Sequence, residues 1–303
     1  MPGPIRYMER TRDYYAALGF AEPYRWAHFA DVPFAPLRVP LRFATVALVT
    51  TAARYDPSLG DQGPGAPYNS AAKFFEVYAA STSDAPDLRI SHVTYDRAHT
   101  KADDVSTYFP LARLREAAAA GRIGRVAPRF YGLPTNRSQR ATIEADAPAL
   151  LERCREDGVD AAVLVPNCPV CHQCAALAAR HLEANGIATV VLGCAMDIVE
   201  HCGVPRCVFS DFPLGNSAGP PHDPQGQAAT LALALGLLES AEGPRTTVTS
   251  PLQWPGAADW KRDYLNAAAL GPDERLALRQ AFDAEKTIAK AISAAVLPLR
   301  GAR

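Results

Sequence analysis

Residues 160 to 186 read DAAVLVPNCPVCHQCAALAARHLEANG and decide the fold that we expect. The apolar run Asp160 to Val165 is typical of a strand that is buried on both faces, as in parallel sheets. Pro169 suits the first position of a helix and Gly186 the residue after its end, so a helix over Cys171 to Asn185 follows. The stretch therefore predicts a strand joined directly to a helix by a turn that carries a cysteine.

Similar apolar runs recur along the chain, with helix-like segments between several of them. The other predicted strands are Phe43 to Thr51, Leu88 to Val93, Ile123 to Phe130, Ile187 to Leu192 and Arg206 to Ser210. The other predicted helices are Leu111 to Ala120, Ala147 to Asp157, Ala228 to Ser240 and Asp273 to Ala295. This alternation predicts an α/β fold, a doubly wound and mostly parallel sheet with helices on both faces.

We divide the chain into three parts that form a single structural unit. Residues 1–40 mix aromatic residues with prolines and are predicted to be an N-terminal arm packed on the core. Residues 41–245 form the α/β catalytic domain, and residues 246–303 form a C-terminal helical extension. The loop from Phe212 to Gln227 is rich in turn residues, and we expect Gly215 to Gly219 to cover the site as a lid.

The composition limits the class of partner. Of 303 residues, 48% are hydrophobic and 21% are charged, which is typical of a globular protein. A formal net charge of -1 gives no field that would attract nucleic acid or an anionic membrane. The sequence shows neither a secretory leader nor a membrane-spanning run, so we expect a cytoplasmic protein that binds a small molecule. The apolar arm and the C-terminal helices favour a homo-oligomer.

The seven cysteines are clustered, unlike a framework of disulfides. Cys168, Cys171 and Cys174 form a CxxCHxC motif with His172, and all four are candidate catalytic residues. Cys168 precedes the predicted helix, where unpaired N–H groups and the helix dipole favour a thiolate, so it is the candidate nucleophile. Cys171 lies one turn further on, and the two thiols can close to a disulfide. His172 is a candidate base or charge partner.

Metal binding is the main alternative use of these residues. The candidate ligands are Cys168, Cys171, Cys174 and Cys202, with Cys207 or His201 as alternatives for the fourth position. Four such ligands fit zinc, and three or four thiolates fit an iron-sulfur cluster. Spacing alone leaves redox chemistry and metal binding both open. Cys154 and Cys194 fit the role of small buried hydrophobic residues.

Ligands of a doubly wound sheet bind beyond the carboxyl ends of its strands. The polar residues near those ends are therefore candidates for substrate binding: Thr50, Thr51, Tyr95, Asp96, Asn167, Asp211 and Asn216. His92 ends a predicted strand at the same edge. It is a further candidate catalytic residue, which would bind or protonate the substrate.

Beyond these motifs, the chain resembles the glycine, sarcosine, betaine and D-proline reductase family, specifically its selenoprotein B type subunit. The resemblance covers most of the chain and includes ISHVTYDR (90–97), DVSTYFPLARLREAAAAGRIG (104–124), GVDAAVLVPNCPVCHQC (158–174) and PRCVFSDFPLGNSAGPP (205–221). The cysteine block looks closest to the D-proline reductase branch.

In that family a selenocysteine opens the motif, and its selenolate attacks the substrate carbon and expels an amine before a cysteine resolves the adduct. The resemblance implies that Cys168 stands at the selenocysteine position and that Cys171 is the resolving thiol. The family reductases also use a pyruvoyl group held by a partner subunit, which implies a place in a reductase complex.

Cysteine in place of selenocysteine leaves two mechanistic classes open. The first is a reductase of a small amino-acid-derived or heterocyclic metabolite, reset by a dithiol or a thiol reductant protein. The second is a desulfidase that releases sulfide from a cyclic thiourea or thiohydantoin, through a persulfide, a bound metal or an iron-sulfur cluster. A non-catalytic module that binds a metal or a thiol is the third alternative.

Overall fold

The computed structural model describes residues 3–90, 92–135 and 138–296, and its centre is one eight-stranded sheet. The strands of this sheet are β1 (Thr45–Thr50), β3 (Tyr78–Ser81), β5 (Arg125–Val126), β6 (Arg129–Gly132), β7 (Ala161–Val165), β8 (Ala188–Gly193), β9 (Arg206–Phe209) and β10 (Thr246–Thr249). Their order is β10-β9-β8-β7-β1-β6-β3, and β5 also pairs with β1. Every pairing is parallel except that of β3 with β6.

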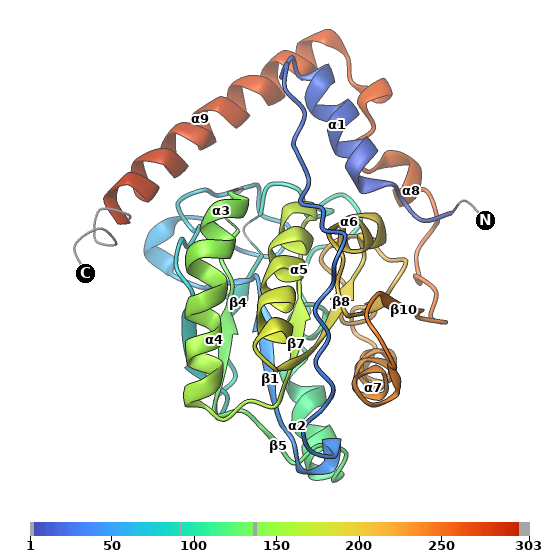
Figure 1. Ribbon diagram of the computed structural model, residues 1–303. Helices are drawn as coiled ribbons and strands as arrows, with labels where there is room; N and C mark the ends of the chain where they lie inside the picture. Colours follow the sequence, from blue (N-terminus) through green and yellow to red (C-terminus); the bar gives the residue numbers. More distant parts are fainter. Residues whose placement is uncertain (1–2, 91, 136–137, 297–303) are drawn as a thin grey trace.

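Helices cover both faces of the sheet, so the predicted doubly wound α/β fold is confirmed (Figure 1). The helices are α1 (Tyr7–Ala17), α2 (Leu111–Ala119), α3 (Gln139–Ala141), α4 (Ala147–Glu156), α5 (Pro169–Ala184), α6 (Met196–Cys202), α7 (Pro224–Ser240), α8 (Trp260–Asp263) and α9 (Pro272–Val296). A π-helical turn, η4 (Thr142–Asp146), leads into α4, and short 3-10 turns are η1 (Leu41–Phe43), η2 (Pro57–Leu59), η3 (Val105–Thr107) and η5 (Ala267–Ala269).

Strand β1 shows why the sequences of the central strands are unbroken runs of apolar residues. Val46 and Leu48 point into the core shared with α2 and α7, whereas Ala47 and Val49 point into the core shared with α4, α5 and α6. All four side chains are at most 1% exposed. A strand covered by helices on both faces needs apolar residues at every position.

Two predicted strands differ from the structure. Of the run Leu88 to Val93, only β4 (Leu88–Arg89) is a strand, and it pairs antiparallel with β2 (Ala53–Arg54) outside the main sheet; residue 91 lies outside the described residues. The run Ile123 to Phe130 is split into β5 and β6 because Pro128 has no N–H to donate.

Some elements of the structure were not predicted from the sequence. The arm of residues 1–40 includes α1, and β3 and β10 are short edge strands. Because β10 pairs with β9, the sheet extends past residue 245, where we divide the domains; that division stays a prediction. None of the described helices combines the length and apolar character that a membrane-spanning segment needs.

Helices α1, α8 and α9 gather together beyond one end of the sheet (Figure 1). Phe282 of α9 packs edge-on against Phe20 and Tyr15, and Arg279 places its guanidinium 3.8 Å from the centre of the Phe20 ring. Arg279 also donates a 3.1 Å hydrogen bond to the carbonyl of Leu18. The N-terminal arm and the last helix therefore pack against each other as one structural unit.

Helix α1 is also tied to α6 through a buried carboxylate. The N–H of Met8 donates to Oδ2 of Asp197 at 2.9 Å, whereas Oδ1 of Asp197 is buried with no hydrogen-bond partner in the described chain. Burial raises the pKa of Asp197 from 3.8 to about 6, although the Met8 N–H works in the opposite direction. The folded protein therefore binds this proton at pH values where the unfolded chain has released it.

Asp197→Asn is expected to gain stability relative to the native protein as the pH rises from 4 to 7. The native carboxyl stabilises the folded state fully only below its unfolded pKa, and that contribution is lost as the pH rises through about 6. The relative gain is about 1 to 2 kcal/mol for a partly exposed group. Urea unfolding at several pH values measures it, with Asp84→Asn at an exposed site as control. A difference that does not change with pH would contradict the expectation.

Candidate active site

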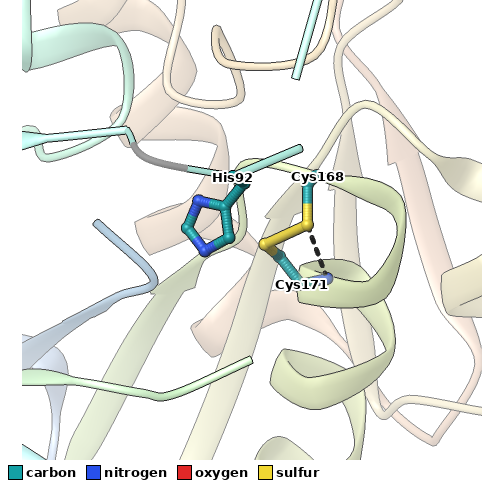
Figure 2. A group of neighbouring side chains, drawn as sticks. All are labelled: His92, Cys168 and Cys171. Carbon is teal, nitrogen blue, oxygen red and sulfur yellow. Dashed lines mark hydrogen bonds between the residues drawn. A yellow bond between two sulfur atoms is a disulfide. The ribbon is translucent and has the colours of Figure 1, made fainter. Parts of the chain in front are cut away.

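The first two cysteines of the motif lie where β7 leads into α5. Cys168 is the residue before the helix, with extended backbone (φ -137°, ψ 168°), and Pro169 is the first helical residue. The Sγ atom of Cys168 accepts a hydrogen bond from the N–H of Cys171 at 3.2 Å. The two sulfurs form a disulfide, shown in yellow in Figure 2, and the Cα atoms are 4.9 Å apart. The predicted helix start and the predicted pairing of these cysteines are both present.

His92 lies beside this pair, as Figure 2 shows. Thr135 connects them, because its hydroxyl lies 3.3 Å from Nε2 of His92 and donates to Sγ of Cys171 at 3.4 Å. Burial, together with the positive charges of Lys73 and Arg97, lowers the pKa of His92 to about 3. One nitrogen of His92 and the sulfurs of Cys168 and Cys171 all lie within 4.8 Å of one another, so this group could hold a metal ion.

A cavity of about 750 Å³ opens onto Cys168 and His92. Aromatic side chains from the arm, from residues 68–74 and from α9 form much of its wall: Tyr15, Phe20, Tyr24, Trp26, Tyr68, Phe74 and Phe282. Basic side chains also line it, namely Arg12, Arg25, Lys73 and Lys286, together with the acidic Glu22. Cys171 is fully buried and is not part of the cavity wall. Of the two cysteines, only Cys168, which is itself 3% exposed, lines the cavity.

His172 holds the backbone around the motif. Its Nδ1 lies 2.8 Å from the carbonyl of Cys168, and its Nε2 accepts hydrogen bonds from the N–H groups of Cys194 and Ala195 at 3.0 and 3.2 Å. Burial lowers the pKa of His172 to about 4, which keeps the ring neutral. Both ring nitrogens are engaged by backbone groups, so the predicted role as a catalytic base finds no support, and His172 instead ties the start of α5 to the end of β8.

The remaining cysteines are core residues. Cys174 accepts a hydrogen bond from the hydroxyl of Thr142 at 3.6 Å and packs in the core beside α4. Burial raises the pKa of Cys154, Cys194 and Cys202 to about 12 in each case. Neither Cys174 nor Cys202 joins the group of His92, Cys168 and Cys171 in the described part of the chain. The predicted metal ligands are therefore brought together only in part.

Three of the predicted substrate-binding residues are buried at or just after the ends of β1 and β7. The hydroxyl of Thr51 accepts hydrogen bonds from the backbone N–H and the side-chain amide of Asn167, at 3.2 and 3.0 Å. The hydroxyl of Thr50 donates to the carbonyl of Tyr108 and accepts from the N–H of Ala52. All three are at most 1% exposed and are not part of the cavity wall. Thr51 and Asn167 hold the backbone just before Cys168, whereas Thr50 bonds to Tyr108 and Ala52.

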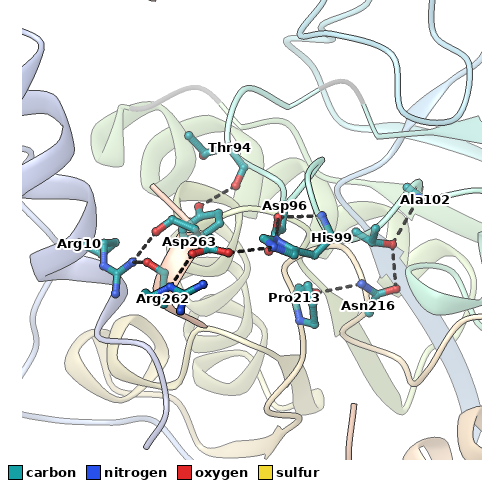
Figure 3. Close-up of polar contacts among 11 residues, drawn as sticks. Arg10, Thr94, Asp96, His99, Ala102, Pro213, Asn216, Arg262 and Asp263 are labelled. Atoms are coloured by element: carbon teal, nitrogen blue, oxygen red, sulfur yellow. Dashed lines mark hydrogen bonds and ion pairs between the residues drawn. The ribbon is translucent and has the colours of Figure 1, made fainter. Parts of the chain in front are cut away.

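The other four predicted binding residues lie in polar networks away from the cavity wall. Asp96 is buried and accepts a 2.9 Å hydrogen bond from Nδ1 of His99, and Nδ2 of Asn216 donates to the carbonyl of Pro213 at 3.0 Å (Figure 3). Asp211 pairs with Lys261, and Tyr95 stacks under the guanidinium of Arg97. Asp211 and Asn216 follow β9 of the main sheet, whereas Tyr95 and Asp96 follow β4, which lies outside it. Their predicted role in substrate binding stays a prediction.

The loop predicted to be a lid is buried. Residues Gly215 to Gly219 are all buried, and the carbonyl of Gly215 accepts a 3.0 Å hydrogen bond from Thr107. A loop enclosed in this way packs beneath residues 95–107 and does not lie over the cavity, so the lid prediction is wrong.

Sequence reasoning missed the residues that close the cavity. Gln173 of α5 accepts a hydrogen bond from the N–H of Ala27 at 2.7 Å and donates to the hydroxyl of Tyr24 at 2.7 Å, which fixes this part of the arm beside Cys168. The contributions of α9 and of Thr135 were also missed. The aromatic residues of the arm were a visible signal, but their pattern did not indicate what they would cover.

Comparison with known proteins places these observations in context. The family model described as "Glycine/sarcosine/betaine reductase selenoprotein B" matches residues 16–167, about half of the chain, and ends one residue before Cys168. The chain is 29% identical to D-proline reductase subunit gamma of Acetoanaerobium sticklandii over 66% of this chain and 80% of that protein. It is 28% identical to glycine reductase complex component B subunit gamma of Carboxydothermus hydrogenoformans, over 63% of this chain and 44% of that protein. No solved structure matches the chain significantly.

Proposed function

Because this chain belongs to the glycine/sarcosine/betaine reductase selenoprotein B family, we propose that it is a reductase subunit in which Cys168 and Cys171 deliver two electrons to a small metabolite. The observation that carries this proposal is the unequal placement of the two sulfurs. Cys168 borders the cavity, and Cys171 lies behind it within bonding distance. A substrate in the cavity meets the first thiol only, and the second thiol reaches the first.

The placement suggests an order for the chemistry. The Cys168 thiolate attacks a substrate carbon, a C–S bond forms, and the C–N bond breaks as the amine departs with a proton. The Cys171 thiolate then attacks Sγ of Cys168, which forms the disulfide, and the electron pair of the C–S bond returns to carbon, which takes up a proton. Two thiols are oxidised and one C–N bond is reduced. An external dithiol restores the thiols.

The helix supports the first step. Two features stabilise an anionic sulfur at Cys168: the hydrogen bond from the N–H of Cys171 and the positive end of α5. The thiol is thereby activated in a way that the cysteines buried in the core are not, because burial raises the pKa of Cys154, Cys194 and Cys202. Cys168 is the proposed nucleophile for this reason.

The cavity favours an anionic substrate with an apolar body. Four basic side chains against one acidic side chain favour a carboxylate, and the aromatic wall favours a ring or hydrocarbon portion. In an amino-acid-derived substrate, this carboxylate is bonded to the same carbon that receives the electron pair when the C–N bond breaks. An amino-acid-derived or heterocyclic acid is the proposed substrate class.

A place in a larger complex is part of the proposal. The relatives named above are subunits, and the chain spans under half the length of the glycine reductase component. We propose that a partner subunit or a thiol reductant protein delivers the reducing equivalents.

The proposal predicts that product formation consumes dithiol in a one-to-one ratio. The purified chain, with dithiothreitol, is incubated with D-proline, glycine, related amino acids and cyclic thioureas; thiol loss, amine release and sulfide release are measured in each case. Reductive cleavage gives one broken C–N bond per disulfide formed: an open-chain amino acid releases its amine, whereas a ring such as that of D-proline opens and keeps a new primary amine in the product. Sulfide release without dithiol loss would replace the proposal with the desulfidase alternative. Turnover of none of these compounds, alone or with cell extract as a source of partner subunits, would contradict it.

A further inference from the structure

We propose that His92, Cys168 and Cys171, once the disulfide is reduced, form a binding site for a soft divalent metal ion of the zinc class. One atom from each residue already lies within 4.8 Å of the other two. Tetrahedral zinc with bonds of about 2.3 Å to sulfur and about 2.0 Å to nitrogen holds its ligand atoms about 3.5 to 3.8 Å apart. Rotation of the two cysteine side chains after reduction can supply the remaining adjustment. The inference goes beyond the proposed function, since binding needs no substrate.

The chemistry of the three donors fits this class of ion. Thiolate and neutral imidazole are the usual ligands of zinc, and both must be unprotonated. The metal ion would offset the two negative charges that reduction creates in a buried place.

Thr135 relates the ring of His92 to the sulfur pair. Nε2 of His92 lies 3.3 Å from the hydroxyl of Thr135, which donates to Sγ of Cys171 at 3.4 Å. In Figure 2, Nδ1 lies on the side of the ring away from the sulfurs, so Nε2 is the nitrogen that faces them. A metal ion would therefore take the place of Thr135 as the partner of Nε2.

The geometry selects among metals as well. An iron-sulfur cluster takes four cysteine thiolates in its common forms, and only two are present here, because Cys174 and Cys202 do not join the group in the described chain. Three protein ligands leave a fourth position open on a zinc-class ion. Cys168 and His92 both border the cavity, so water or a substrate atom can fill that position.

Metal binding and disulfide formation exclude each other. Binding by the two thiols releases up to two protons and transfers no electrons, whereas the disulfide has no thiolate left to donate. The ion would therefore hold the pair in its reduced form and withhold it from the reaction until a chelator or partner removes it.

Cobalt(II) titration of the full chain tests the site, because tetrahedral cobalt-thiolate binding gives visible absorption. Protein reduced with a phosphine and desalted without oxygen is expected to bind one equivalent, which zinc displaces; the oxidised protein binds none. Cys171→Ser is expected to lose the thiolate band, and His92→Ala to bind at least about ten-fold more weakly. Cys202→Ala, which removes a buried cysteine outside the group, is expected to bind normally.

Three outcomes would overturn the inference: no stoichiometric binding by the reduced protein, an unchanged affinity in His92→Ala, or loss of binding in Cys202→Ala. Thermal unfolding of each variant without metal verifies that it is folded. Turnover is measured separately in the presence of a chelator, so failure of the metal site and failure of the proposed reductase activity give different results.

Discussion

We expect Cys168→Ser to lose turnover by about three orders of magnitude or more and to form no covalent adduct, whereas Cys171→Ser should also lose turnover but accumulate an adduct on Cys168. The two results differ because the sulfurs have different surroundings. Cys168 borders the cavity and is the only one of the pair that a substrate can meet. Cys171 is fully buried, so its loss prevents resolution of the adduct but not its formation.

Mass spectrometry of the intact protein after incubation with substrate measures the adduct. Before a substrate is found, iodoacetamide gives the same discrimination, since the reduced protein should be alkylated first at Cys168. Cys154→Ala is the matched control, because that thiol is buried beside Tyr131 and remote from the cavity, and it should keep nearly native turnover. Full activity in Cys168→Ser, or an adduct on Cys171 instead, would remove the basis of the mechanism.

Glu183→Ala is expected to destabilise the protein by about 3 to 5 kcal/mol, the largest stability effect that we anticipate. Glu183 and Arg206 form a 2.8 Å ion pair whose side chains are at most 1% exposed. Glu183 also accepts hydrogen bonds from the N–H groups of Ala35 and Thr189, and Arg206 donates to the carbonyl of Ala35 at 2.9 Å. Removing the carboxylate leaves a buried guanidinium without its counter-charge and releases the arm.

Guanidinium chloride unfolding, followed by circular dichroism, measures this loss. Glu239→Ala is the control, since its ion pair with Arg122 is about 40% exposed on both sides and should contribute no more than about 1 kcal/mol. A double variant, Glu183→Met with Arg206→Leu, should lose less than the single change because no unpaired charge remains. A loss below 1 kcal/mol in Glu183→Ala would show that the pair does not anchor the arm.

The strand and helix around the cysteine motif were predictable because every local signal agreed. The β7 run is apolar throughout, Pro169 begins α5, and Gly186 follows its end with a φ of +82° that favours glycine. The edge strands β3 and β10 escaped prediction because they are short and only partly buried, so their sequences carry neither an unbroken apolar run nor a strict alternation.

His92 was predicted from a strand end, and that strand stops at Arg89. The residue nevertheless lies beside the cysteines, because the chain that leaves β4 crosses the carboxyl edge of the sheet. The cavity wall could not be predicted in the same way. It depends on contacts such as that of Tyr15 with Phe282, residues that no local pattern relates.

The contact between the arm and α9 has a consequence for biosynthesis. The sheet and the cysteine turn are complete in the emerging polypeptide well before residue 282 leaves the ribosome, and Phe282 and Lys286 are needed to finish the cavity. Because domains begin to fold during translation, we expect the cavity beside Cys168 to stay incomplete until the last helix arrives. On the proposed function, the newly made chain would then be the form most open to thiol damage.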